Sequence, residues 1–138
     1  MFAKGDKAQG VEVVGFIGRG MSIEGRLCFD DTVRVEGVFK GEIDARGTLV
    51  VGEGGRVEGD IRVGSAVIAG EVYGVLQAAS RVELRAPGKV YGEIKTPNLI
   101  IGEGAVFDGK CVMVRKETGE LVEEVEYGET IEPIEEAR

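Results

Sequence analysis

The sequence predicts an all-β protein that folds as a parallel β-helix, a solenoid of about six coils. Three observations support this fold class. One short glycine-centred pattern recurs six times along the chain, apolar residues alternate with polar ones within each copy, and glycine-rich turn segments separate the copies. Alternation with a period of two indicates strands, not helices.

The recurring pattern has the form apolar-x-Gly-x-apolar, and its successive glycines are 16, 18, 15, 18 and 17 positions apart. The six central glycines are Gly25, Gly41, Gly59, Gly74, Gly92 and Gly109. A unit this short cannot bury its own apolar face, so the units must share a core by stacking, at ~4.8 Å per coil. The glycines fall on the inward side of the alternation, which predicts that the backbone approaches the axis or turns a corner there.

Each coil also contains a second, shorter strand. Short apolar runs precede the later motifs, at Val33–Val35, Leu49–Val51, Ala66–Ile68, Val82–Leu84 and Leu99–Ile101. Segments 52–55, 85–88 and 102–105 have the glycine and proline content of turns. We therefore expect coils that consist of a motif strand, a short strand and tight corners.

Composition divides the chain into a flexible N-terminal tail (1–15), a β-helix domain (16–113) and an acidic, disordered C-terminal tail (114–138). The last segment contains nine Glu and only three basic residues, so its net charge is −6. Such a segment is typical of a solvating tail. The alternative is a partner-docking peptide formed by its apolar residues, which are Leu121, Val122, Val125, Ile131 and Ile134.

Charge and cysteine content narrow the class of protein. A net charge of −8 argues against nucleic-acid binding. The absence of a long apolar run and of a signal-peptide pattern predicts a cytoplasmic protein, and two cysteines fit a reducing compartment. Cys28 and Cys111 belong to the first and sixth coils, roughly 24 Å apart at the coil spacing of a solenoid, too far for a disulfide. We expect Cys111 to be a free buried thiol.

The sequence contains no equipment for catalysis, so we expect neither an enzyme nor a cofactor or metal. It has no histidine, which removes the common nucleophile pairs and the base on which left-handed hexapeptide-repeat acyltransferases rely. The glycine-rich turns lack the Gly-Lys-Ser/Thr ending of a phosphate loop. Asp30 and Asp31 are too few carboxylates to hold a cation well, and a turn is the better interpretation.

The two ends of the solenoid are the candidate functional surfaces. A β-helix exposes unpaired strands at its ends, and no convincing cap is evident here, while the core phenylalanines cluster near both ends. Large side chains that fill a looser end of the core are the alternative. The predicted polymer interface comprises Phe107, Leu99, Ile101, Val112 and Met113 at one end, and Phe16, Ile23 and Phe29 at the other. Among these, Phe107 is expected to leave part of its ring uncovered for a neighbouring subunit.

The segment from Gly15 to Met113 resembles the bactofilins, a family of bacterial polymer-forming cytoskeletal proteins. The resemblance is carried by Phe16–Gly25, Val35–Ile43, Val82–Pro87 with Val90–Pro97, and Gly102–Cys111. The resemblance implies a right-handed β-helix with disordered tails. It also implies nucleotide-independent, non-polar filaments that form by end-to-end contact at the inner face of the cell membrane and recruit cell-wall synthesis or morphogenesis proteins.

The N-terminal tail resembles the short membrane-targeting start of bactofilins, with Met1, Phe2, Lys4 and Lys7 as the targeting residues. An ordinary disordered terminus is the alternative for this tail. For the whole chain, the alternative to a filament scaffold is a non-polymerising, monomeric or trimeric β-helical binding module.

Overall fold

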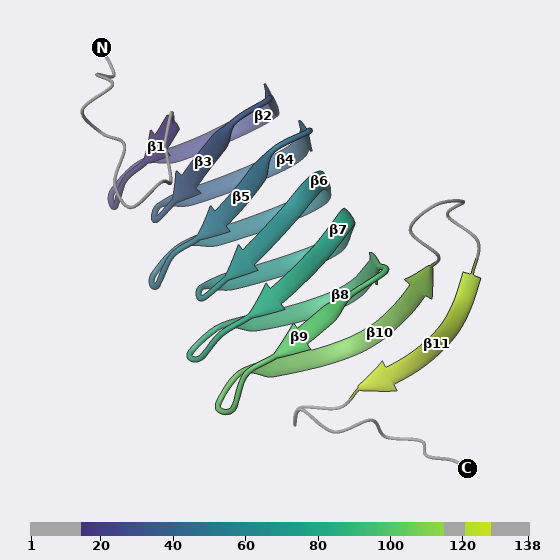
Figure 1. The fold of residues 1–138 in the computed structure, drawn as a ribbon. Coiled ribbons are helices and arrows are strands. Elements are labelled where there is room, and N and C mark those ends of the chain that lie inside the picture. Colours follow the sequence, from purple (N-terminus) through teal and green to yellow (C-terminus); the bar gives the residue numbers. More distant parts are fainter. Residues whose placement is uncertain (1–14, 115–120, 128–138) are drawn as a thin grey trace, which may run out of the picture.

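A computed structural model describes residues 15–114 and the strand at 121–127, with side chains described through residue 114 and at Glu124. The predicted membrane-targeting residues and most of the acidic tail lie outside this range. The described residues form eleven strands, of which β1 to β10 wind into a parallel solenoid (Figure 1). No helix long and apolar enough to cross a membrane occurs among them.

Two ladders of strands make up the walls of the solenoid. The long strands are β2 (Ser22–Phe29), β4 (Val38–Ala45), β6 (Arg56–Ile68), β7 (Glu71–Leu84), β8 (Lys89–Thr96) and β10 (Val106–Val114). The short strands are β1 (Gly15–Ile17), β3 (Thr32–Val35), β5 (Thr48–Val51) and β9 (Leu99–Ile101), and the second halves of β6 and β7 take this place in the middle coils. The predicted solenoid of about six coils, with a motif strand and a short strand in each, is confirmed.

The coils stack in register although the segments between them differ in length. Each motif glycine lies opposite the motif glycine of the next coil, from Gly25 and Gly41 through to Gly92 and Gly109. Every pairing between coils is parallel. The turns at 52–55, 85–88 and 102–105 absorb most of the differences in length, and a register shift between Val63 and Ser65, where β6 pairs with β7, absorbs one residue.

Contact between coils explains why the motif requires glycine. Gly59 has φ +130°, in the region that L side chains rarely adopt, and a Cβ added there would overlap the carbonyl oxygen of Gly41. The same overlap with the preceding glycine occurs at Gly74, Gly92 and Gly109. The sequence predicted that the backbone approaches the axis or turns a corner at these glycines; they lie within continuous strands, and the close approach that the structure shows is between successive coils.

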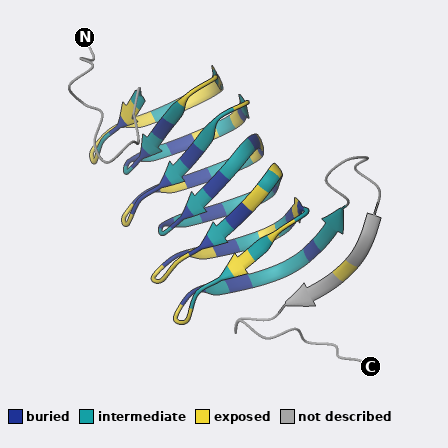
Figure 2. Cartoon of the chain, viewed as in Figure 1, coloured by how far each residue is buried: buried dark blue, intermediate teal, exposed yellow. Residues whose placement is uncertain are grey.

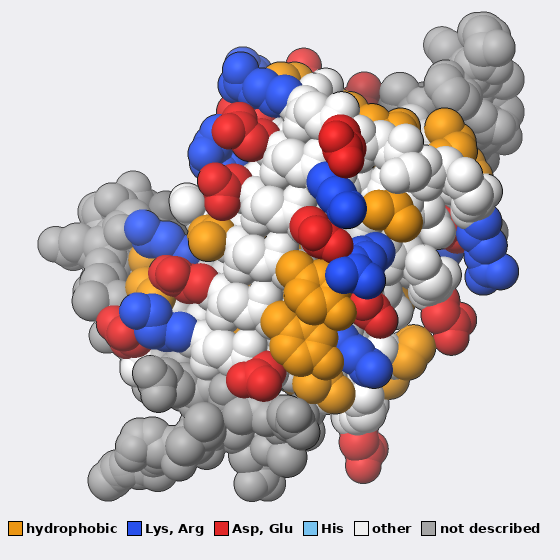
Figure 3. Space-filling view, turned by 180° about the vertical axis from the view of Figure 1, so that it is seen from behind, with side chains coloured by type: hydrophobic (Ala, Val, Ile, Leu, Met, Phe, Trp, Pro, Cys, Tyr) orange, Lys and Arg blue, Asp and Glu red, His pale blue; other side chains and the backbone are white. Residues whose placement is uncertain are grey.

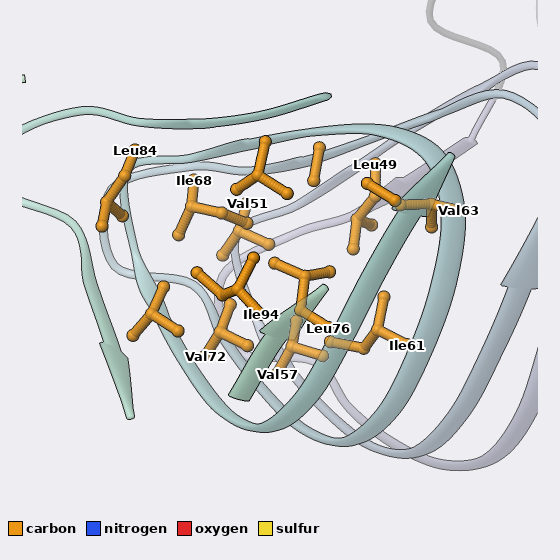
Figure 4. Close-up of a cluster of buried hydrophobic side chains, with 14 of the residues drawn as sticks. Leu49, Val51, Val57, Ile61, Val63, Ile68, Val72, Leu76, Leu84 and Ile94 are labelled. Atoms are coloured by element: carbon orange, nitrogen blue, oxygen red, sulfur yellow. The ribbon is translucent and has the colours of Figure 1, made fainter. Parts of the chain in front are cut away.

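Apolar columns fill the interior of the solenoid (Figure 4). One column runs from Ile23 through Phe39, Val57, Val72 and Val90 to Phe107; another runs from Leu27 through Ile43, Ile61, Leu76 and Ile94 to Cys111. All members from the second coil onward are buried. Cys111 is a buried thiol outside any disulfide, as predicted, whereas Cys28 is exposed.

The last strand departs from the solenoid pattern and from the predicted tail. The sequence favoured a segment without regular structure from residue 114 onward, but β11 (Leu121–Tyr127) pairs with β10. The pairing is antiparallel and runs from Gly109 opposite Tyr127 to Val114 opposite Leu121. β11 therefore occupies the edge of β10 where another coil would stack, but it does not continue the winding (Figure 1).

Candidate polymerisation surfaces

The N-terminal end of the described solenoid is an open face. β1 pairs only with β3 and β2 only with β4, so the outer edges of both strands carry no strand partner among the described residues. The inward side chains of β2, which are Ile23, Leu27 and Phe29, are only half-buried, whereas the equivalent Phe39 and Ile43 of the next coil are buried. Figure 2 shows this gradient from the exposed outermost strand to the buried middle coils. Backbone hydrogen-bonding groups and apolar side chains are thus available together at this face.

Phe16 differs from its predicted role as an inward core residue. It alternates with Ile17, and Ile17 takes the inward position because it stacks on Val35 in the column below. Phe16 consequently points outward and 52% of its surface is exposed. Met21, in the turn that follows β1, is 47% exposed. The N-terminal end therefore presents two large apolar side chains in addition to its open strand edges.

At the C-terminal end, the expectation of a partly uncovered Phe107 ring is wrong. Phe107 is fully buried, in the same column as Val90. Val112 also departs from the predicted patch, because it alternates with Cys111 and lies on the outer surface of β10 beside Lys95. The alternation that places Val112 outward is present in the sequence, whereas the full burial of Phe107 is not apparent from it.

The rest of the predicted C-terminal group lies at the end of the core. Leu99, Ile101 and Met113 are half-buried and pack against the core cluster. β9 pairs only with β7, so its other edge carries no strand partner within the described part of the chain, and Ile100 on this strand is 47% exposed. Within the described residues, β11 thus covers β10 from Gly109 to Val114, and no strand covers the outer edge of β9.

Charged ladders cover the sides of the solenoid. Asp44 accepts hydrogen bonds from Arg26 of the coil before it and Arg62 of the coil after it, each at 3.3 Å. The Arg62 hydrogen bond, with that of Arg26, lowers the pKa of Asp44. Other arginines pair with a glutamate two residues away on the same coil, at Arg34–Glu36, Arg56–Glu58 and Arg85–Glu83. Most of these side chains are substantially exposed, so each pair stabilises the fold only slightly.

One aromatic pair interrupts these ladders. Tyr73 and Tyr91 stack with ring centroids 5.1 Å apart, and the guanidinium of Arg56 lies 4.6 Å from the centroid of Tyr73. Tyr73 also donates a hydrogen bond to Glu71, which raises the pKa of Tyr73. Figure 3 shows a small hydrophobic group among side chains of both charges on this side of the molecule. Because Tyr91 stacks on the ring of Tyr73 and Arg56 lies over that same ring, the ring of Tyr73 is largely occupied by contacts within the chain.

The described residues contain no constellation typical of catalysis. No group of three or more His, Cys, Asp or Glu side chains comes together there as a metal site requires. Two surface grooves have volumes of about 350 and 420 Å³. The larger is lined mainly by glycines and by Arg56, Glu71 and Lys89, and Arg56 is already paired with Glu58. The features that distinguish this molecule are therefore its two ends.

Comparison with known proteins is consistent with a role for the two ends of the solenoid in self-association. The bactofilin family, described as polymer-forming cytoskeletal, matches residues 15–112. The chain belongs to the bactofilin family. It is 38% identical to bactofilin BacO of Myxococcus xanthus over 101 residues, which cover 73% of this chain and 80% of BacO. It is 36% identical to bactofilin BacP of the same organism over 105 residues, 76% of this chain and 44% of BacP. No solved structure matches the chain.

Family membership makes this bactofilin a member of a structural, polymer-forming class, and the described solenoid coincides with the matched segment. Sequence reasoning missed Met21 and Ile100 as exposed apolar residues at the two ends. A signal for both was present, since each is a large apolar residue at an outward position of the first or last coil. Sequence reasoning also did not identify β11, where the local sign of a strand is the alternation of Val125 and Tyr127 with Glu124 and Glu126.

Proposed function

We propose that this bactofilin is a scaffold protein that assembles end to end into filaments, without nucleotide, at the inner face of the cell membrane. The observation that carries the proposal is the location of the exposed apolar side chains. The three large ones in the described residues, Phe16, Met21 and Ile100, all belong to the outermost coils. They lie beside strand edges that carry no strand partner there. Such a surface favours contact with a second copy of the same fold.

The two ends contribute different residues to the proposed contacts. At the N-terminal end, Phe16 offers an exposed ring, and Ile23 and Phe29 border the open edge of β2. At the C-terminal end, Leu99, Ile101 and Met113 border the last coil, while Phe107 supports it from the core. Contact between equivalent ends gives a filament without polarity, and recruited cell-wall or morphogenesis proteins would bind along its sides.

Electron microscopy and sedimentation of the purified chain without nucleotide test the proposal. Phe16→Arg places a charge on the open N-terminal face, where desolvation in a contact would penalise it, so we expect shorter or no filaments with β circular dichroism retained. Val75→Arg is the matched control, because Val75 is a half-buried outward residue in the middle of the rod. A wild-type protein that stays monomeric or trimeric would instead support the non-polymerising binding module.

Membrane association is proposed to come from Met1, Phe2, Lys4 and Lys7. Burial of Phe2 contributes about 2–3 kcal/mol and each lysine near an anionic surface about 1 kcal/mol, which is weak for one molecule. A filament presents many tails at once, and this multivalency makes binding stable.

The membrane proposal is tested with anionic liposomes and preassembled filaments. Phe2→Ala, or Lys4→Glu with Lys7→Glu, should release filaments from the liposomes without dissolving them. Co-sedimentation of both variants at the wild-type level would exclude the tail as the anchor.

A further inference from the structure

The two ends of the molecule are not equally accessible, and the difference arises from β11. At the N-terminal end, β1 and β2 both have an outer edge without a strand partner among the described residues. At the C-terminal end, β11 covers β10 from Gly109 to Val114. Only the short edge of β9 and the first part of β10 lie outside this pairing.

β11 cannot be a seventh coil of the same kind. Every other pairing of strands in the described residues is parallel, and only β10 with β11 is antiparallel. β11 thus returns along the strand it covers and closes the backbone positions that a neighbouring subunit's coil would use. We propose that β11 is a built-in competitor of C-terminal end-to-end contact, so that the C-terminal end assembles only when β11 leaves β10.

The pairing of β11 has features of a replaceable strand. Its register shifts between Met113 and Val114, which interrupts the ladder at the end of β10. β11 contains three glutamates, and Lys110 is the single basic residue in the β10 segment that it covers. The ion pair between Lys110 Nζ and Glu124 Oε2 is 3.1 Å long, but the two side chains are 41% and 47% exposed. Solvent screening therefore limits its contribution.

Covalent attachment gives β11 a kinetic and thermodynamic advantage over a second molecule. A short connection keeps a tethered segment at an effective concentration of about millimolar, well above the usual concentration of a free protein. A second copy of the chain displaces β11 from β10 only where its own contact with the C-terminal end is more extensive than that of β11. The expected result is a raised critical concentration for filament growth through the C-terminal end. This inference rests on the proposed function, because it presumes that the chain polymerises.

A reversible disulfide lock tests the inference in the full chain. Val112 and Glu124 lie directly opposite each other in the antiparallel register, a geometry within the Cα separations that disulfides tolerate. We would combine Val112→Cys and Glu124→Cys with Cys28→Ser, which removes the exposed native thiol. The Cys28→Ser chain, with the same oxidant, controls for oxidation itself.

The oxidised double variant should stop at assemblies of at most two subunits, and reduction should restore sedimentable filaments. Conversely, Val125→Pro weakens β11 by removing a backbone donor and should lower the critical concentration several-fold, whereas Ile131→Pro, beyond β11, should not. Equal polymerisation of the oxidised and reduced forms overturns the inference and leaves the proposed function standing. Absence of polymer in every form, wild type included, overturns both.

Discussion

The motif glycines illustrate how a single hydrogen in place of a methyl group decides whether two coils can stack. Gly59 and Gly25 have similar backbone angles, with φ of +130° and +137°. A Cβ at Gly59 would overlap the carbonyl oxygen of Gly41, whereas a Cβ at Gly25 meets nothing within 4 Å, because no described coil precedes it.

Gly59→Ala should therefore lower the free energy of unfolding by at least about 3 kcal/mol, from backbone strain and from overlap with the neighbouring coil. Gly25→Ala suffers the strain alone, so its cost should be about 1–3 kcal/mol. Urea unfolding followed by circular dichroism measures both. Equal costs at the two positions would show that backbone angle, and not stacking, explains the column.

Phe107 and Phe16 differ in exposure, so substitutions at the two positions should differ in their effect on stability. Phe107 is fully buried and Phe16 is 52% exposed. Phe107→Ala should cost about 3–5 kcal/mol of stability, whereas Phe16→Ala should change it by about 0.5 kcal/mol or less. Phe107→Arg should unfold the last coil instead of giving a folded small oligomer. A folded, stable Phe107→Arg protein would restore the original expectation of an uncovered ring.

At the scale of the strands, the ion pair that joins β2, β4 and β6 responds to pH through Asp44. Hydrogen bonds from Arg62 and Arg26 lower the pKa of Asp44 in the folded protein. The stabilisation is therefore present above the ordinary aspartate pKa of about 4 and is lost as pH falls through the lower folded value.

Asp44→Asn should lower the thermal midpoint at neutral pH, and its difference from wild type should shrink as the pH falls below about 4. Asp60→Asn, on the outer side of β6, serves as the control, because Asp60 lies outside this Arg–Asp–Arg ladder. A difference for Asp44→Asn that stays constant from neutral to acidic pH would mean that the two arginines do not hold this carboxylate differently in the folded state.

The strands also show which parts of the fold were predictable from sequence. The coils were predictable, because each copy of the glycine-centred alternation indicates a strand. The recurrence of that alternation also indicates which residues of successive strands stack in one column. β11 was not predictable, because its glutamates are typical of a solvating tail. Its pairing also depends on the free edge of β10, and the local sequence of β11 does not indicate that edge. The assignment of Val112 to the C-terminal patch was wrong because Val112 alternates with the inward Cys111, and that of Phe107 was wrong because its ring is fully buried. Phe16 was expected in the core but is exposed, because Ile17, with which it alternates, takes the inward position.

For the whole molecule, assembly should require neither nucleotide nor metal. No cluster of metal-ligating side chains exists in the part of the chain that the structure describes, and the glycine-rich corners at 52–55 and 102–105 serve as turns between coils. Treatment with a chelator and removal of nucleotide should leave the sedimentable fraction unchanged. Loss of polymer under either condition, reversed by adding the missing component, would contradict this expectation.

The parallel register of the coils also has a mechanical consequence. Backbone hydrogen bonds between coils run along the axis of the solenoid, because they join equivalent residues of successive coils. Tension spread over a whole end face is shared by all the backbone hydrogen bonds between two successive coils, so these bonds must break together. Tension applied to one chain terminus reaches one bond at a time and peels the solenoid coil by coil. A filament held through its end faces would therefore withstand pulling far better than one held through the tails of its subunits, and its weakest point would be the contact between subunits.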